Sequence, residues 1–271
     1  TILLLVAAIV SVAAQAYEPL IREDRVWEYY NEGGGNICLY RYQFDGTQEI
    51  NGTTYHQFKH KTTIIWETKY TVDSEGNRVY YDVVSDPIQI DETVALIREE
   101  NQKVYMYVEY PNLYVYDPES GFDFQDLPED KEIVILDFSE NEIGSKFLAT
   151  GDQPGFDNYI RFFEGWPITQ YEVLSVVEDS DSQRNIHTLK NIPVYAFVNR
   201  GSKPDIEKAN VRIAEGVGNI GRGTFFMPQT ELRIFITGSP YHGELYSYIE
   251  DYFNNLYDLD GNILFKGLDK H

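Results

Sequence analysis

Two carboxylates lie beside tryptophans, and this arrangement suggests glycan chemistry. Glu67 directly follows Trp66, and Glu164 stands two residues before Trp166. Glycosidases need two carboxyl groups about 5–10 Å apart, so these two residues are the candidates for hydrolysis of a glycan. Since the chain has 44 acidic residues, such neighbours arise by chance. We therefore interpret them as solvated charges that protect strand edges from aggregation.

His56 and His60 form an H-x-x-x-H pair, a spacing that can bind zinc from one face of a helix. Their surroundings favour a strand, in which four residues span about 13 Å. One ion cannot bridge that distance, and the sequence offers no obvious third ligand. His187, His242 and His271 are isolated. We predict no metal-binding residue.

The segment 215–221, Glu-Gly-Val-Gly-Asn-Ile-Gly, contains the pattern G-x-G-x-x-G. This pattern binds dinucleotides only where it joins a parallel strand to a helix. The following residues 222–228 are poor helix formers, so we predict a glycine-rich turn between strands. Asp258, Asp260, Gly261 and Asn262 also lack the full spacing of a calcium-binding EF-hand loop, and we interpret them as a turn.

The sequence lacks the other common catalytic patterns. It has no G-x-S-x-G, no H-E-x-x-H and no Cys–His nucleophile arrangement. We therefore assign no catalytic and no cofactor-binding residue, and we expect no cofactor.

Aromatic side chains are the remaining chemical resource, with 22 Tyr, 15 Phe and 3 Trp. Such residues usually pack across strands, and this is our interpretation; the alternative is a platform that stacks on sugar rings. The candidates for a platform are Trp27, Tyr29 and Tyr30, or Tyr107, Tyr110, Tyr114 and Tyr116.

These residues must be positioned by strands, because alternating apolar and polar residues recur between turn signals. Asn51-Gly52 is the strongest hairpin signal, since both residues tolerate the positive φ of a type I′ turn. The fold class predicted is all-β, an antiparallel meander, sandwich or partly closed barrel, with at most one short C-terminal helix. The predicted strands cover residues 40–45, 53–58, 62–67, 69–72, 79–83, 93–98, 103–110, 133–138, 170–177, 185–189 and 194–199.

Several segments carry more specific expectations. The strand 133–138 is continuously apolar and predicts a central strand covered on both faces. Residues 111–131 and 151–167 are predicted to be long surface loops. Near the C-terminus the spacing permits a helix through Leu245, Tyr248, Ile249, Tyr252, Phe253 and Leu256. We favour a hairpin of strands 232–237 and 244–249 instead.

Residues 1–16 form an uninterrupted apolar run that ends in Ala14-Gln15-Ala16. The run is too short to span a bilayer and has the core and cleavage site of a secretory signal peptide. We expect an extracytoplasmic protein, in the periplasm, on the outer surface or secreted, after cleavage near Ala16. Residues 17–271 are then a single β-rich domain without a transmembrane segment.

The net charge narrows the possible partners. The formal net charge of −22 repels nucleic acid and anionic lipid, so glycans, proteins and apolar small molecules remain.

The cysteine content bears on disulfide bonds. Cys38 is the one cysteine, which excludes an intramolecular disulfide. It lies in an apolar run, and we predict a buried small hydrophobic side chain.

Several short motifs in order along the chain resemble uncharacterised secreted β-rich proteins of Bacteroidota. They are Arg25-Val26-Trp27, Phe44-Asp45-Gly46, Asn51-Gly52, Tyr55, Ile97-Arg98-Glu99, Lys103-Val104-Tyr105, Ile135-Leu136-Asp137-Phe138 and Glu215-Gly216-Val217-Gly218. The resemblance implies residence outside the cytoplasm and a β-rich fold. Its members often carry a type IX secretion sorting domain, and residues 256–262 are loosely similar to the core of that domain.

The hypothesis that follows is a secreted, non-catalytic protein of the cell envelope with a binding or structural role. One alternative is a barrel-like carrier of an apolar ligand, with Val104, Met106 and Val108 lining its cavity. The other is a glycan-degrading enzyme that uses Glu67 or Glu164.

Overall fold

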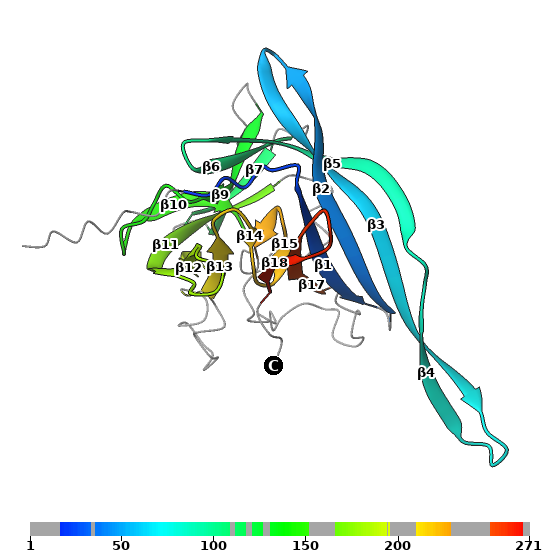
Figure 1. The fold of residues 1–271 in the computed structure, drawn as a ribbon. Helices are drawn as coiled ribbons and strands as arrows, with labels where there is room; N and C mark the ends of the chain where they lie inside the picture. Colours follow the sequence, from blue (N-terminus) through cyan, green and yellow to red (C-terminus); the bar gives the residue numbers. More distant parts are fainter. Residues whose placement is uncertain are drawn as a thin grey trace, which may run out of the picture.

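The computed structural model describes residues 17–33, 36–108, 112–117, 121–126, 131–151, 166–193, 195, 210–228 and 250–267. The strands β1 to β18 formed by these residues are arranged in two large sheets and one two-stranded sheet (Figure 1). The all-β prediction is confirmed. No helix within these ranges is long and apolar enough to cross a membrane.

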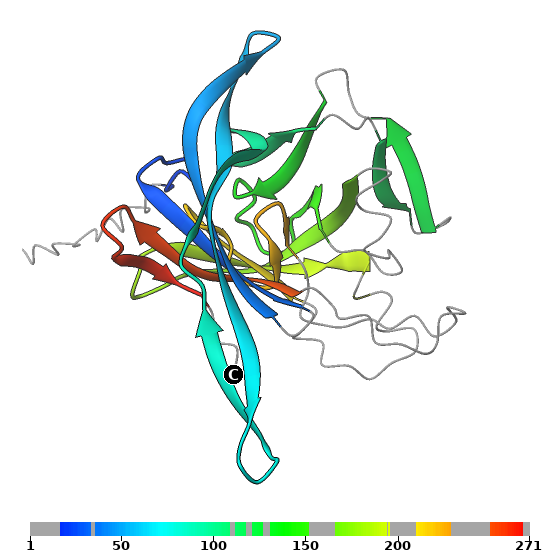
Figure 2. The same cartoon turned by 90° about the vertical axis from the view of Figure 1, so that its right-hand side faces the viewer.

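The first sheet has nine strands in the order β18-β17-β1-β2-β3-β5-β6-β9, with β4 paired to β3 outside this path. All of its pairs are antiparallel, and it curls into half a barrel (Figure 2). Its strands are β1 (Arg25–Gly33), β2 (Asn36–Ile50), β3 (Thr53–Val72), β4 (Arg78–Val84), β5 (Ile88–Glu100), β6 (Lys103–Tyr107), β9 (Glu132–Asp137), β17 (Glu250–Asp258) and β18 (Ile263–Lys266).

The second sheet has the order β14-β13-β12-β11-β7-β8, and β10 also pairs with β11. The β11–β7 pair is parallel, whereas the others are antiparallel. Its strands are β7 (Asn112–Asp117), β8 (Gly121–Asp126), β10 (Lys146–Thr150), β11 (Trp166–Glu178), β12 (Asn185–Asn191), β13 (Asn210–Ala214) and β14 (Gly218–Asn219). The two-stranded sheet pairs β15 (Gly223–Thr224) with β16 (Met227–Pro228).

The core lies between the two large sheets. Trp27, Phe44 and Phe58 from the first sheet and Tyr171 from the second are fully buried. Phe225, beside β15, stacks on Phe58 with ring centroids 4.4 Å apart. Burying such a side chain stabilises the fold by about 1.5–3 kcal/mol, so these aromatic residues are a main reason that the two sheets stay together.

The turn at Asn51-Gly52 is confirmed, since both residues have positive φ values of 51° and 81° and join β2 to β3. The end of the preceding strand was predicted too early. Instead of stopping at residue 45, β2 passes through a bulge between Phe44 and Thr47, where Gly46 adopts a φ of +84°. The three segments predicted within residues 53–72 are one continuous strand, β3, whose register shifts against both β2 and β5.

Two other predictions are wrong. Residues 111–131 are not one long loop, because the hairpin of β7 and β8 lies within them. The strand within residues 133–138 is buried on both faces as expected, but it is β9, the last strand of its sheet rather than a central one.

Predictions near the C-terminus and in two loops fall partly outside the described residues. Tyr252, Phe253 and Leu256 lie in β17, so the alternative helix is wrong for these residues. The strands predicted at 232–237 and 244–249 lie outside the described residues, as do residues 152–165 and, apart from Tyr195, residues 194–199.

Candidate functional site

The glycine-rich turn, residues 215–221, joins β13 to β14, and residues 215–220 are buried. The predicted turn between strands is confirmed. Two of its backbone amides already have partners, because Val217 and Ile220 donate N–H groups to the carbonyls of Ala214 and Arg212, each at 3.1 Å. A dinucleotide pyrophosphate is bound at the N-terminus of a helix, whereas this turn leads into the strand β14.

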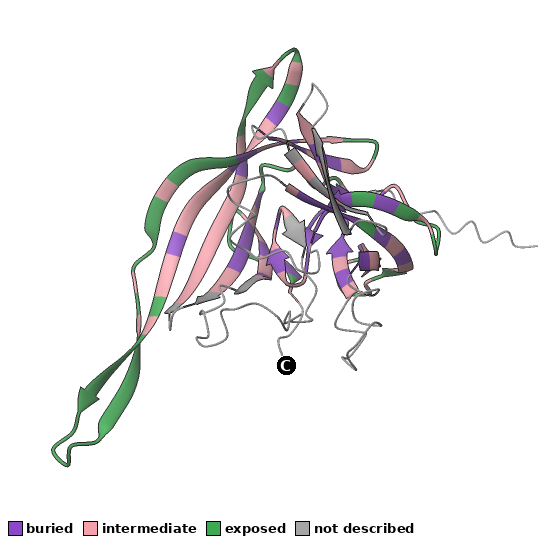
Figure 3. Ribbon diagram, turned by 180° about the vertical axis from the view of Figure 1, so that it is seen from behind, coloured by how far each residue is buried: buried purple, intermediate pink, exposed green. Residues whose placement is uncertain are grey.

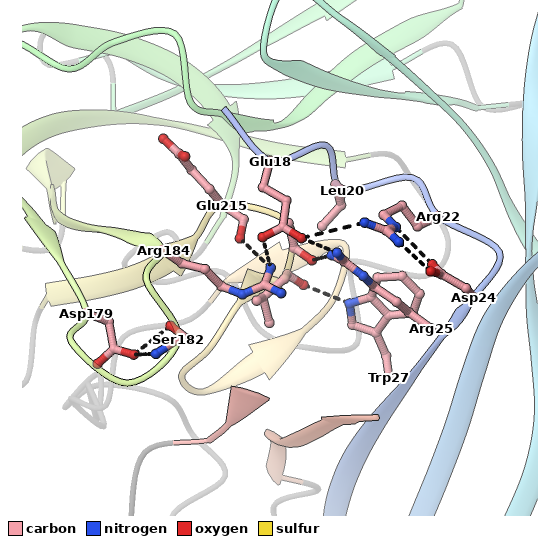
Figure 4. Close-up of polar contacts among 12 residues, drawn as sticks. Glu18, Leu20, Arg22, Asp24, Arg25, Trp27, Asp179, Ser182, Arg184 and Glu215 are labelled. Carbon is pink, nitrogen blue, oxygen red and sulfur yellow. Dashed lines mark hydrogen bonds and ion pairs between the residues drawn. The ribbon is translucent and has the colours of Figure 1, made fainter. Parts of the chain in front are cut away.

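Two buried arginines hold the glycine-rich turn against the N-terminal segment (Figure 4). Arg25 donates to the Gly216 carbonyl at 2.7 Å and pairs with Glu18. Arg184 donates to the Glu215 carbonyl at 3.1 Å and lies 2.7 Å from the other oxygen of Glu18. Burial lowers the pKa of the Arg184 guanidinium, and the Glu18 carboxylate opposes that shift. One carboxylate therefore bridges two guanidinium groups that would otherwise repel each other.

Glycine is required in this turn because the arginines approach it closely. Gly216 has a φ of +67°, and a Cβ there would lie 2.6 Å from Nη1 of Arg184. Trp27 donates its indole N–H to the Val217 carbonyl at 2.8 Å. The turn thus interacts with both the charged and the aromatic side chains that approach it.

His187 lies in the same cluster and is fully buried. Its Nε2 is 3.5 Å from Oε1 of Glu215, while its ring packs edge-on against Phe138 at 5.5 Å. Glu215 also accepts a hydrogen bond from Asn185 at 3.1 Å. The carboxylates of this cluster are therefore occupied by arginine, amide or histidine groups, and the arrangement serves to connect the sheets.

A surface cleft of about 800 Å³ opens beside this cluster. In its wall, Arg98 donates two hydrogen bonds to Glu132, at 2.5 and 2.7 Å, and Tyr55 donates to the same carboxylate at 2.6 Å. Burial raises the pKa of Glu132, but the hydrogen bonds from Arg98 and Tyr55 outweigh it and hold the pKa below its ordinary value. The lining residues are Tyr17, Pro19, Ile21, Gly52, Thr53, Thr54, His56, Arg98, Glu99, Glu100, Asn101 and Gln102.

The N-terminal segment closes one side of this cleft. Glu99 accepts backbone hydrogen bonds from Leu20 at 3.0 Å and Ile21 at 3.1 Å, together with the Tyr17 hydroxyl. Burial and the Glu99 charge raise the pKa of Tyr17. The carboxylates of Glu99 and Glu132 thus already have internal donors.

The described candidates for catalysis and metal binding, Glu67, His56 and His60, all lie in β3. Glu67 lies in β3 and pairs with Lys69 at 2.9 Å, while Glu164 lies outside the described residues. His56 and His60 both lie in β3, where burial lowers the pKa of His60. Within the described ranges, no group of three His, Cys, Asp or Glu side chains could hold a metal ion.

Cys38 differs from expectation, whereas Trp27 and Tyr29 follow it. Cys38 is a free, half-buried thiol rather than a fully buried one. Trp27 and Tyr29 are buried and pack in the core, as in our preferred interpretation. Tyr30 and Tyr107 are half-buried, and the side chains of Tyr110, Tyr114 and Tyr116 lie outside the described part of the chain.

The exposed aromatic residues lie elsewhere, on the arm that we define as residues 66–84. Here β3 and β4 pair from Trp66–Val84 to Val72–Arg78 and project from the body of the protein (Figures 1 and 2). Figure 3 shows both strands of the arm mostly exposed, in contrast to the body. The exposed large apolar side chains of the arm are Trp66, Tyr70, Val72, Val79, Tyr80, Tyr81 and Val84.

The register places three of these aromatic residues on one face of the arm. Trp66, Tyr70 and Tyr80 are 41%, 53% and 60% exposed, and the two tyrosine rings lie 5.9 Å apart. On the same face, the Arg78 guanidinium lies 4.7 Å from the centre of the Tyr70 ring. This face has the composition of a binding surface, because aromatic residues and arginine are enriched in interfaces.

The alternation that creates this face is visible in the sequence. Trp66, Tyr70 and Val72 are spaced by even numbers of residues, and Glu67 and Lys69 fall between them. The sequence does not show that the described residues place no second layer over the arm (Figure 3), because this is a property of the tertiary structure.

No protein-family model, curated protein or solved structure matches this chain.

Proposed function

We propose that this chain is a secreted, non-catalytic protein of the cell envelope that acts by binding, and that the arm is its contact surface. The apolar run at residues 1–16, with its Ala14-Gln15-Ala16 end, supports export with cleavage near Ala16.

The exposed apolar side chains of the arm carry this proposal. Proteins rarely expose a contiguous apolar surface unless it binds something, and a two-stranded hairpin alone is marginally stable in water. An arm that displays Trp66, Tyr70 and Tyr80 therefore gains stability when a partner covers it.

Charge narrows the class of partner. The net charge of −22 disfavours polyanions, including nucleic acid and anionic lipid surfaces. Proteins and neutral glycans remain as partners.

The two alternatives gain less support. An apolar carrier would need Val104, Met106 and Val108 to line a cavity, and these side chains belong to the packed core cluster. A glycosidase that uses Glu67 would need a second carboxylate nearby, and the carboxylate of Asp82 on the paired strand lies on the opposite face of the arm.

Cosedimentation with envelope fractions from the native cells tests the proposal. We expect the mature protein to pellet with the envelope, and a Trp66→Ala, Tyr70→Ala, Tyr80→Ala triple variant to lose at least about tenfold in affinity, since interface aromatic residues each contribute about 1 kcal/mol or more. The matched control replaces three exposed apolar residues of the body, Ile143, Leu148 and Val177, by alanine, and it should bind normally. Equal retention of all three proteins, or efficient turnover of a glycan or peptide, would overturn the proposal.

A further inference from the structure

The outer edge of β4 is an unpaired strand edge. In the described residues, β4 pairs with β3 on one side and with no strand on the other. Asp73 donates its N–H to the Asn77 carbonyl at 3.0 Å, and Ser85 donates to the Ile65 carbonyl at 2.9 Å. Bonded and non-bonded pairs alternate in an antiparallel ladder, so the odd-numbered residues of β4 bond to β3. The residues whose backbone groups face outward are Arg78, Tyr80, Asp82 and Val84.

This edge lacks the features that normally prevent strand pairing. Natural edge strands carry proline, bulges or several charges, but β4 reads Arg-Val-Tyr-Tyr-Asp-Val-Val and its register with β3 is uninterrupted. Five of these seven residues are valine or tyrosine, which have high β-propensity, and a segment of this kind without proline or glycine and with low net charge readily adds to another strand. Because Arg78 and Asp82 cancel, β4 is neutral within a chain of net charge −22.

The order of residues in β4 is complementary to itself. If a second copy pairs antiparallel with Tyr80 on the two-fold axis, Arg78 lies opposite Asp82 of the second copy, and the reverse contact follows by symmetry. Val79 then lies opposite Tyr81 of the second copy, a favourable pair of β-branched and aromatic residues. Outward-facing backbone groups meet outward-facing groups in this register, so each bonded pair exchanges two hydrogen bonds.

The side chains of this pairing already share one face of the arm. Arg78 stacks on Tyr70 at 4.7 Å, and Asp82 accepts a hydrogen bond from Thr68 at 2.8 Å. These contacts hold both charges on the face where the register requires them, which lowers the entropy lost on pairing.

We propose that this protein forms a two-fold dimer in which the β4 strands of two copies pair antiparallel through Arg78 and Asp82. This inference rests on the proposed role of the arm as a contact surface and names a second copy as its occupant. The dimer extends each two-stranded arm into a four-stranded ribbon, which removes both exposed β4 edges.

Sedimentation velocity of the full mature chain, compared across charge variants, tests the pairing. Arg78→Asp places like charges opposite each other twice, as does Asp82→Arg, and each single variant should raise the dimer dissociation constant at least about tenfold. The double variant, Arg78→Asp with Asp82→Arg, restores opposite charges and should return the constant to within about threefold of the wild type. Lys69→Asp makes the same charge change on the arm but away from the edge, and should leave the dimer intact.

A backbone variant tests the same edge independently of charge. Tyr80→Pro removes an outward N–H and leaves the bonds between β3 and β4 in place, so it should give a monomer whose circular dichroism matches the wild type. A monomeric wild type, or a dimer that survives both Tyr80→Pro and the single charge variants, would overturn the inference. If the wild type is monomeric while envelope binding still depends on the arm, only the dimer fails; if the dimer forms but envelope binding is independent of the arm, the proposed function fails.

Discussion

The arm and the glycine-rich turn invert the usual distribution of polarity. The arm exposes tryptophan, tyrosine and valine to solvent, whereas the turn buries two arginines and a glutamate around residues 215–221. Exposed apolar patches and buried charges are the placements that call for an explanation. The buried charges are paired within the chain, whereas the aromatic residues of the arm stay exposed although Tyr70 contacts Tyr80 and Arg78. This difference is the reason that we propose the arm as a contact surface.

Replacing one arginine in each region should give the largest difference in the free energy of unfolding between the two regions. Arg25→Met removes one of the two buried guanidinium partners of Glu18 and the donor to the Gly216 carbonyl, and we expect a loss of about 3–5 kcal/mol in the free energy of unfolding. Arg78→Met removes an exposed cation–π contact worth no more than about 1 kcal/mol. Urea unfolding followed by tryptophan fluorescence measures both. Equal losses would show that the two regions do not differ in the way described.

One glycine in each region sharpens the comparison. Gly216→Ala combines a positive φ with a Cβ 2.6 Å from Arg184, and should cost about 3 kcal/mol. Gly76 in the turn of the arm also has a positive φ, +88°, but a Cβ there meets nothing within 4 Å, so Gly76→Ala should cost about 1 kcal/mol. Thermal unfolding measures both variants. A lower melting temperature for Gly76→Ala than for Gly216→Ala would contradict this expectation.

Glu132 is partly buried, and we expect its pH-dependent contribution to the free energy of unfolding to be smaller than the effects of the arginine and glycine variants. Hydrogen bonds from Arg98 and Tyr55 hold its pKa below the ordinary 4.5, against the effect of burial. The unfolded chain therefore takes up the proton first as pH falls, so the stabilisation is fully present above pH 4.5 and is lost through the lower, folded pKa. The stability difference between wild type and Glu132→Gln should shrink over that interval. As a control, Glu75→Gln changes an exposed residue in the turn of the arm and should alter the free energy of unfolding by no more than about 0.5 kcal/mol.

Local signals in the sequence predicted those parts of the fold that depend on local chemistry. Asn51-Gly52 specified its turn through the positive φ that both residues tolerate. The residues after the glycine-rich segment 215–221 are poor helix formers, and this predicts the turn that the structure contains. The predicted strand 79–83 agrees with β4, which spans Arg78–Val84 and is one residue longer at each end.

Predictions failed where the outcome depended on distant parts of the chain. Residues 111–131 looked like a loop because of their prolines and acids, yet Leu113 and Val115 alternate with tyrosines and pair with β8. Trp27 and Trp66 lie in similar alternating patterns, but only Trp27 is covered, by Phe44, Phe58 and Phe225. Alternation identifies which side chains share a face, and only the tertiary fold decides whether that face is covered.

The continuity of β3 has a mechanical consequence. This strand runs unbroken for 20 residues, about 66 Å at 3.3 Å per residue. It begins after the turn at Asn51-Gly52, crosses the body of the protein and ends near the tip of the arm (Figure 1). A pull along the arm is transmitted through one backbone to the ladders with β2 and β5. There it acts in shear on many hydrogen bonds at once instead of opening them one by one. A tether fixed to the arm therefore pulls against the whole half-barrel.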